Sequence, residues 1–206
     1  MIELHGFAKS SSVSRVRIAL ALKNLRYTDL DVDLSLHEQH ESAFRALNPQ
    51  AMVPVYNDDN SIISQSLAII EYLDERYPEP PLLPRDLATR ARARQYANII
   101  VSDIAPFATK RVAAYLDDGL GLDEAARQRW LHYWLLEGLD SLELWLASAR
   151  SITRFSVGNE ISIADICLVP QLTLARRLKL DVEEFPRLCS IEAACLELDA
   201  FTNNLP

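Results

Sequence analysis

Three consecutive serines, Ser10, Ser11 and Ser12, stand where a short apolar segment ends and a helical pattern begins. The first turn of a helix offers unpaired backbone N–H groups and a partial positive charge. A thiol held there is shifted towards the thiolate, and a serine hydroxyl can donate a hydrogen bond to the sulfur anion. Ordinary capping of the helix by Ser11 or Ser12 is the competing interpretation, and the residue types alone favour it.

Two further pairs of residues could bind a small polar ligand. Gln65-Ser66 opens an amphipathic helical segment, where a carboxylate is favoured by free N–H groups and by the side-chain donors. The same pair could be a simple helix cap, and the two roles are compatible. Val53-Pro54 begins a strand-like stretch, and a proline there needs a special reason. It could present backbone groups to an extended peptide, or form an ordinary turn.

Composition excludes several classes of function. The chain has 206 residues, 49% of them hydrophobic, and a formal net charge of −8. Neither half is basic, so nucleic-acid binding is not expected. No apolar run is long enough to span a membrane, and the first residues do not resemble a signal peptide, so we expect a cytoplasmic protein without membrane contact.

The cysteines and histidines do not form a metal-binding pattern. The three cysteines, Cys167, Cys189 and Cys195, lack CxxC spacing, and the four histidines are not arranged as ligands. We therefore expect no metal site, and we interpret the cysteines as buried apolar residues.

The first 78 residues alternate strand and helix patterns in the order β-α-β, a loop, then β-β-α, which is an α/β arrangement. The expected elements are a strand at 1–6, a helix at 12–25, a strand at 27–34, a hairpin at 53–63 that turns at 57–60, and a helix at 64–77.

A proline-rich stretch at 79–87 predicts a connector between domains, because clustered prolines cannot form helix interior. Residues 88–206 show only helical periodicity, so we expect an all-helical second domain. Its predicted helices cover 88–116 with a kink at Pro106, 122–149, 162–178 and 186–201. Three tryptophans are expected in its core: Trp130, Trp134 and Trp145. Ser162 and Asp165 have the spacing of a capping box.

This layout resembles that of the cytosolic glutathione transferases, and four stretches resemble their zeta class. They are SSSVSRVRIALALKNL, ALNPQAMVPV, QSLAIIEYLDERYP and ADICLVPQ. The last lies within GNEISIADICLVPQ, which resembles the second-domain signature of the wider family. The zeta class includes maleylacetoacetate isomerase and the bacterial maleylpyruvate isomerases. The resemblance implies a thioredoxin-like N-terminal domain at 1–78 followed by an all-α helical bundle, and glutathione as cofactor.

The resemblance also implies roles for the polar residues of the first domain. Ser10 aligns with the serine that activates the glutathione thiol, Ser11 becomes a second donor or the helix cap, and Ser12 stands where the class has cysteine. Glutathione would then contact six residues: Gln39, Gln50, Val53, Pro54, Gln65 and Ser66. Among them Gln65 and Ser66 would hold the γ-glutamyl end, a cis proline at 54 would receive the cysteinyl part, and Gln39 would reach the glycine carboxylate. Gln39 and Gln50 could instead be ordinary loop residues.

Two other mechanisms of the superfamily are absent from this chain. Some relatives use a tyrosine in place of the serine, but the first tyrosine here is Tyr27. Others use a cysteine, but residues 1–166 contain none, so a protein thiol cannot act in the first domain.

The isomerases of this class act on small keto diacids, which need cationic partners. The candidates are Lys9, Lys110, Arg111 and Arg176, and relatives that take maleylpyruvate carry arginine near the last two positions. Each could instead be a solvated surface charge. Arg15 and Arg17 are expected to be structural.

The expected activity is glutathione-dependent cis–trans isomerisation of maleylacetoacetate or maleylpyruvate in a homodimeric enzyme. Two alternatives remain. One is a broader transferase that acts on electrophiles or α-haloacids with the same thiolate, and the other is a non-catalytic binding module with the same fold.

Overall fold

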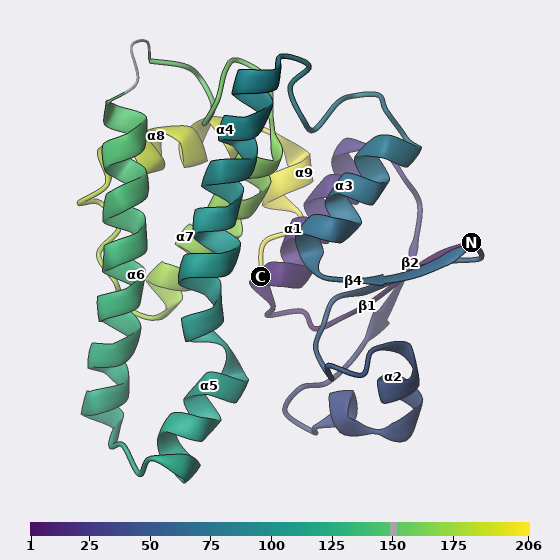
Figure 1. Ribbon diagram of the computed structural model, residues 1–206, viewed down its shortest axis with the longest axis vertical. Coiled ribbons are helices and arrows are strands. Elements are labelled where there is room, and N and C mark those ends of the chain that lie inside the picture. The colour runs from purple at the N-terminus through teal and green to yellow at the C-terminus, as the bar shows by residue number, and fades with distance from the viewer. Residues whose placement is uncertain (149–151) are drawn as a thin grey trace. The chain divides into compact units, whose positions relative to one another are not determined.

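The structure is a computed structural model that describes residues 1–148 and 152–206. It divides into two compact units, one formed by Met1–Leu83 together with Leu198–Pro206, and the other by Pro84–Glu197 (Figure 1). No helix in the described residues is long and apolar enough to cross a membrane.

The first unit contains a four-stranded mixed sheet in the order β2-β1-β3-β4. β1 pairs parallel with β2 and antiparallel with β3, and β3 pairs antiparallel with β4. Figure 1 shows α1 and α3 side by side on one face of the sheet and α2 on the other. The elements are β1 (Ile2–Gly6), α1 (Ser11–Leu22), β2 (Thr28–Asp31), η1 (Glu38–His40), α2 (Ser42–Leu47), β3 (Val55–Asp58), β4 (Ser61–Ser64), α3 (Ser66–Arg76) and α9 (Asp199–Thr202).

The stretch predicted as a loop before the hairpin contains the helix α2, so that prediction was wrong. α2 has six residues, which is less than two turns and too short to show a helical period. Its Phe44 is buried in a small cluster with Val32 and Val55. This hydrophobic contact, rather than local propensity, holds the helix in place.

A buried lysine fixes the end of α1. The Lys23 side chain is fully buried, and its ammonium group donates to Asp74 Oδ1, the Tyr77 carbonyl and the Pro80 carbonyl, each at 2.6 Å. All three protons are therefore satisfied, which a buried ammonium group requires. The contacts join the end of α1 to the end of α3 and to the chain that follows.

The second unit is helical, as predicted, but the long helix expected at 88–116 is interrupted. A π-helical segment and a 3₁₀ turn that contains Pro106 separate α4 from α5, because proline lacks the N–H that would continue the helix. The elements are α4 (Leu87–Asn98), η2 (Ile99–Ile104), η3 (Ala105–Ala108), α5 (Lys110–Ala114), η4 (Tyr115–Gly119), α6 (Glu124–Ala147), α7 (Ile163–Arg177) and α8 (Pro186–Cys195).

The three tryptophans of α6 do not form the core, contrary to the prediction. Trp145 is 51% exposed, and Trp130 and Trp134 are half-buried beside Phe107, whose ring stacks on Trp134 at 4.3 Å. The buried face of α6 is aliphatic and follows the helical repeat through Leu135, Gly138, Leu139, Leu142 and Leu146. Trp145 follows Leu142 by three residues and Gly138 by seven, so it lies at the edge of this face, where it is exposed.

The cysteine prediction holds for two residues of three. Cys167 and Cys195 are buried, whereas Cys189 is half-buried and its thiol lies 3.2 Å from the Val182 carbonyl. Burial raises the pKa of Cys195, so this thiol stays protonated and inert.

The predicted capping box is present at the start of α7. Ser162 is the N-cap, and the fully buried Asp165 carboxylate accepts from the Ser162 amide and from the Ser156 amide, each at 2.8 Å, and from the Ser162 hydroxyl at 2.9 Å. The carboxylate thus accepts hydrogen bonds from the N-cap of α7 and from the preceding loop.

Replacing Asp165 with alanine leaves two buried amides without acceptors. We expect the free energy of unfolding to fall by about 3 kcal/mol, the sum of a lost cap and an unsatisfied donor. Denaturant titration measures this. The matched control is Asp140→Ala on the exposed face of α6, which should change stability by less than about 0.5 kcal/mol. Equal effects of the two variants would contradict the structural role of Asp165.

Candidate active site

The strand register brings three of the predicted segments to one edge of the sheet. His5 near the end of β1 lies opposite Val55 at the start of β3, and Val55 lies opposite Ser64 at the end of β4. The chain that leaves β1 towards Ser10, the chain that enters β3 from Val53-Pro54, and the chain that leaves β4 into Gln65-Ser66 therefore meet at this edge.

Ser10 is the N-cap of α1. Its backbone is extended, and its hydroxyl oxygen accepts from the Val13 amide at 3.4 Å. Its carbonyl accepts the first helical bond, from the Ser14 amide at 2.9 Å. Within the described residues no acceptor takes the Ser10 hydroxyl proton. Because the hydroxyl caps through a lone pair, it can still donate that proton, so capping and stabilisation of a thiolate are compatible in this one residue.

Ser11 and Ser12 are the first two residues of α1, and both are half-buried. The alternative that Ser11 or Ser12 caps the helix is wrong, since the cap is Ser10. Their amides belong to the helix end that lacks intrahelical acceptors, so they add N–H donors and the positive end of the dipole beside Ser10.

The peptide bond between Val53 and Pro54 is cis, as the resemblance implied. Pro54 is buried and directly precedes β3.

Gln65 has a backbone conformation that side-chain-bearing residues seldom adopt, with φ of 74°. It is the N-cap of α3, but its side chain does not cap the helix. Instead its amide nitrogen donates to Gln50 Oε1 at 2.9 Å, so the structure joins two of the predicted ligand-binding residues. Such conformations cost about 1–3 kcal/mol and concentrate at functional sites.

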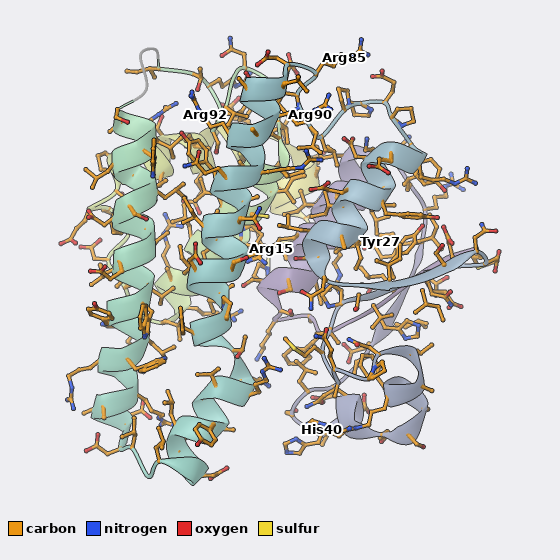
Figure 2. All side chains as sticks on the ribbon, in the orientation of Figure 1. Arg15, Tyr27, His40, Arg85, Arg90 and Arg92 are labelled. Atoms are coloured by element: carbon orange, nitrogen blue, oxygen red, sulfur yellow. The ribbon has the colours of Figure 1, made fainter. Side chains whose placement is uncertain are left out.

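A buried arginine joins the first turns of α1 and α3. Arg15 is 1% exposed, and its Nη1 donates a long hydrogen bond of 3.5 Å to the hydroxyl of Ser66, itself 6% exposed (Figure 2). The sequence predicted a structural Arg15 but not this partner. The available signal was its place on the apolar stripe of α1 with Ile18 and Ala19.

Gln39 lies on η1, beside the His40 marked in Figure 2 on the α2 side of the sheet. Its Oε1 is buried and lacks a hydrogen-bond partner among the described residues. No hydrogen bond in the described residues joins the Gln39 side chain to the segments at the sheet edge.

All four predicted cations are exposed. Lys9 directly precedes the cap of α1, and Lys110 and Arg111 are the first two residues of α5 in the second unit. As the first residue of α5, Lys110 places a cation where it opposes the helix dipole.

Arg176 differs from the other three cations. Its two terminal nitrogens donate to the two carboxylate oxygens of Glu192, each at 2.6 Å, and Glu192 is 5% exposed. These bonds, together with charge attraction, raise the pKa of Arg176. The Arg176 side chain is 41% exposed, but the ion pair with Glu192 largely compensates its charge. Each terminal nitrogen retains one N–H beyond this pair.

The described residues contain no cluster of His, Cys, Asp and Glu with the geometry of a metal site. The donors at the sheet edge are hydroxyls, amides and backbone N–H groups, which suit an anionic organic ligand.

Comparison with known proteins identifies the family. Residues 4–81 match the N-terminal domain of glutathione S-transferase, and residues 136–198 match its C-terminal domain. A maleylpyruvate isomerase from Ralstonia sp is 42% identical over 205 residues, which cover 100% of this chain and 97% of that protein.

Solved structures of relatives superpose on this chain over nearly its full length. A holo maleylpyruvate isomerase described as a bacterial zeta-class glutathione S-transferase superposes with a TM-score of 0.95 at 42% identity, covering 99% of this chain and 96% of that one. A maleylacetoacetate isomerase from Anaeromyxobacter dehalogenans, with dicarboxyethyl glutathione and citrate in its active site, has a TM-score of 0.87 at 38% identity and covers 100% and 94%. The chain therefore belongs to the zeta class of glutathione S-transferases, the family of the maleylacetoacetate and maleylpyruvate isomerases.

Proposed function

We propose that this chain is a glutathione-dependent cis–trans isomerase of a maleyl keto diacid, either maleylpyruvate or maleylacetoacetate. One observation carries the proposal: Ser10 caps α1 and keeps its hydroxyl proton, at the position where the class activates the glutathione thiol. Full-length similarity to isomerases of both substrates supports it.

Glutathione fits the sheet edge of the first unit. Ser66 and the amide of Gln65 bind the γ-glutamyl carboxylate at the start of α3, where N–H groups and the dipole favour an anion. The backbone of Val53, before the cis Pro54, pairs with the cysteinyl part as an added strand would. The sulfur then lies at the start of α1. Relatives with glutathione in their active sites support this placement.

Gln50 and Gln39 complete the peptide site in this proposal. The hydrogen bond from the Gln65 side chain places the Gln50 side chain next to the peptide site, where it can also contact the peptide. Gln39 offers a buried amide oxygen that lacks a partner among the described residues, and its amide nitrogen can donate to the glycine carboxylate.

The reaction proceeds by addition and elimination. The thiolate, stabilised by the Ser10 hydroxyl and the amides of Ser11 and Ser12, attacks the alkene carbon and forms a C–S bond. The alkene electron pair moves to the keto oxygen as an enolate, and the former double bond rotates as a single bond. Collapse of the enolate restores the double bond in the trans form and breaks the C–S bond. Glutathione is regenerated, so the protein supplies binding, orientation and charge.

Cations hold the substrate carboxylates and the enolate in this proposal. Lys9, Lys110 and Arg111 are exposed and charged, and Arg176 contributes its remaining N–H groups beside Glu192. A relative from Methylobacterium with bound malonate and glutathione, and another with citrate, support a site for dicarboxylates.

We also propose that the chain forms a homodimer and acts in the cytoplasm. Closed symmetric dimers are the commonest assemblies of soluble proteins. Exposed apolar side chains on α6, among them Leu144 at 62% and Trp145 at 51%, leave area for such a contact.

The assay that tests the function compares maleylpyruvate and maleylacetoacetate with and without glutathione. We expect fast conversion of at least one of them to the fumaryl isomer, and none above background without glutathione. Turnover confined to aryl halides or haloacids would favour the broader transferase. A chain that fails to bind millimolar glutathione would be the non-catalytic module.

Replacing Ser10 with alanine should lower kcat at least 100-fold, because the thiolate loses its hydroxyl donor and α1 loses its cap. Affinity for glutathione should change less than about fivefold, since Ser66 and Val53 bind other parts of the peptide. Steady-state kinetics and calorimetry separate the two effects. Ser12→Ala leaves the cap intact and should cost less in kcat. An unchanged rate in Ser10→Ala would remove Ser10 from the mechanism.

Replacing Arg111 with alanine should raise KM for the keto diacid about tenfold or more, as expected for a charge-assisted hydrogen bond, and should leave glutathione affinity unchanged. Arg129→Ala is the matched control, because Arg129 is an exposed cation on α6 with the same charge. If both variants raise KM equally, only net charge is involved and Arg111 does not contact the substrate.

A further inference from the structure

Consecutive buried residues early in α1 contact three different elements of the first unit. Val13 packs on β1, where a Cβ added to Gly6 would lie 2.5 Å from Val13 Cγ1. Arg15 reaches Ser66 on α3. Ser14, between them, reaches the segment Leu198–Pro206. The helix is therefore held on three sides just beyond the serines.

The contact of Ser14 spans almost the whole chain. Ser14 is fully buried, and its hydroxyl donates to the backbone carbonyl of Asn204, 190 positions away in sequence. In Figure 1 the end of the chain lies at the first turn of α1. The segment is anchored by the fully buried Phe201, and Asn204 is held by bonds from its amide to the Phe201 carbonyl and from its side chain to the Ala200 carbonyl.

Ser14 is also bonded directly to Ser10. Its amide donates to the Ser10 carbonyl at 2.9 Å, and the neighbouring Val13 amide donates to the Ser10 hydroxyl at 3.4 Å. A movement of Ser14 would therefore carry Ser10 with it. The first turn of a helix has the fewest intrahelical bonds and is the part most ready to fray, so an external contact there has a large effect on order.

We propose that Ser14 and the Asn204 carbonyl form a positioning contact, through which the segment Leu198–Pro206 holds the Ser10 hydroxyl in line with the sulfur of bound glutathione. Ser14 does not touch glutathione; it acts through Ser10. The inference rests on the proposed function, because it assigns Ser10 to the thiolate. Small displacements of a catalytic group cost large factors in rate, so this contact matters to kcat more than to binding.

Two independent changes remove the contact. Ser14→Ala deletes the donor, and a stop codon after Asn203 deletes the acceptor while Phe201 remains. For each variant we expect kcat for isomerisation to fall about tenfold, the factor expected for loss of one buried hydrogen bond. The glutathione dissociation constant should stay within about twofold, since its γ-glutamyl contacts are on α3. The midpoint of the pH–rate profile should rise towards the value for free glutathione.

The double variant is the sharpest test. If both changes act through one bond, the combined loss in kcat equals that of either single variant, whereas independent effects multiply. Ser141→Ala is the matched control, because that hydroxyl donates to the Gly138 carbonyl within α6 of the second unit. It should leave the pH profile unchanged. Circular dichroism and thermal unfolding show whether each variant is folded.

Three outcomes would overturn the positioning role. They are an unchanged pH profile in folded Ser14→Ala, multiplicative losses in the double variant, or an equal shift in Ser141→Ala. If one of the two single variants is unfolded, the pH profile of the other single variant tests the positioning role. If the wild-type chain binds glutathione but isomerises neither keto diacid, the titration of the bound thiol replaces the rate as the readout. A wild-type chain that binds no glutathione would refute the proposed function, and this inference with it.

Discussion

The burial of α1 is the constraint on which the rest of the site depends. The helix is covered by β1, α3 and the segment Leu198–Pro206, so the polar groups within it must find partners inside the first unit. Lys23 reaches the end of α3, Ser14 reaches the Asn204 carbonyl, and Arg15 reaches Ser66. These contacts hold α1 in place, while the N–H groups of its first turn stay available to a ligand. A preorganised anion site needs donors that are held in place in this way.

The same geometry explains how a simple hydroxyl can support the chemistry. Ser10 uses a lone pair to cap α1 and retains its proton, so in the proposed mechanism capping and thiolate stabilisation use different parts of one side chain. The difficult chemistry belongs to glutathione, and the protein contributes dipole, donors and orientation. In the proposed function Arg176 of the second unit also has two roles: its bidentate pair with Glu192 fixes the guanidinium plane, and its remaining N–H groups bind an anion.

Much of the fold and of the candidate site was predictable from short-range sequence patterns. The capping box at Ser162 and the start of α3 at Gln65-Ser66 were evident from local sequence, and the cis bond before Pro54 followed from the family resemblance. The predictions that were wrong failed for physical reasons. α2 is too short to show a period. Trp145 fits the apolar spacing of α6 but lies at the edge of the buried face, so spacing alone does not show that it is exposed. Partners distant in sequence, such as Asn204 for Ser14, leave no local signal.

The most direct test of the central claim is the pKa of the glutathione thiol when it is bound to this protein, followed by ultraviolet absorbance of the thiolate. A free thiol titrates near a pKa of about 8.5. We predict a bound pKa lower by at least about one unit in the wild-type protein, and a return towards the free value in Ser10→Ala. A bound thiol that titrates like free glutathione, or a lowered pKa that survives Ser10→Ala unchanged, would contradict it.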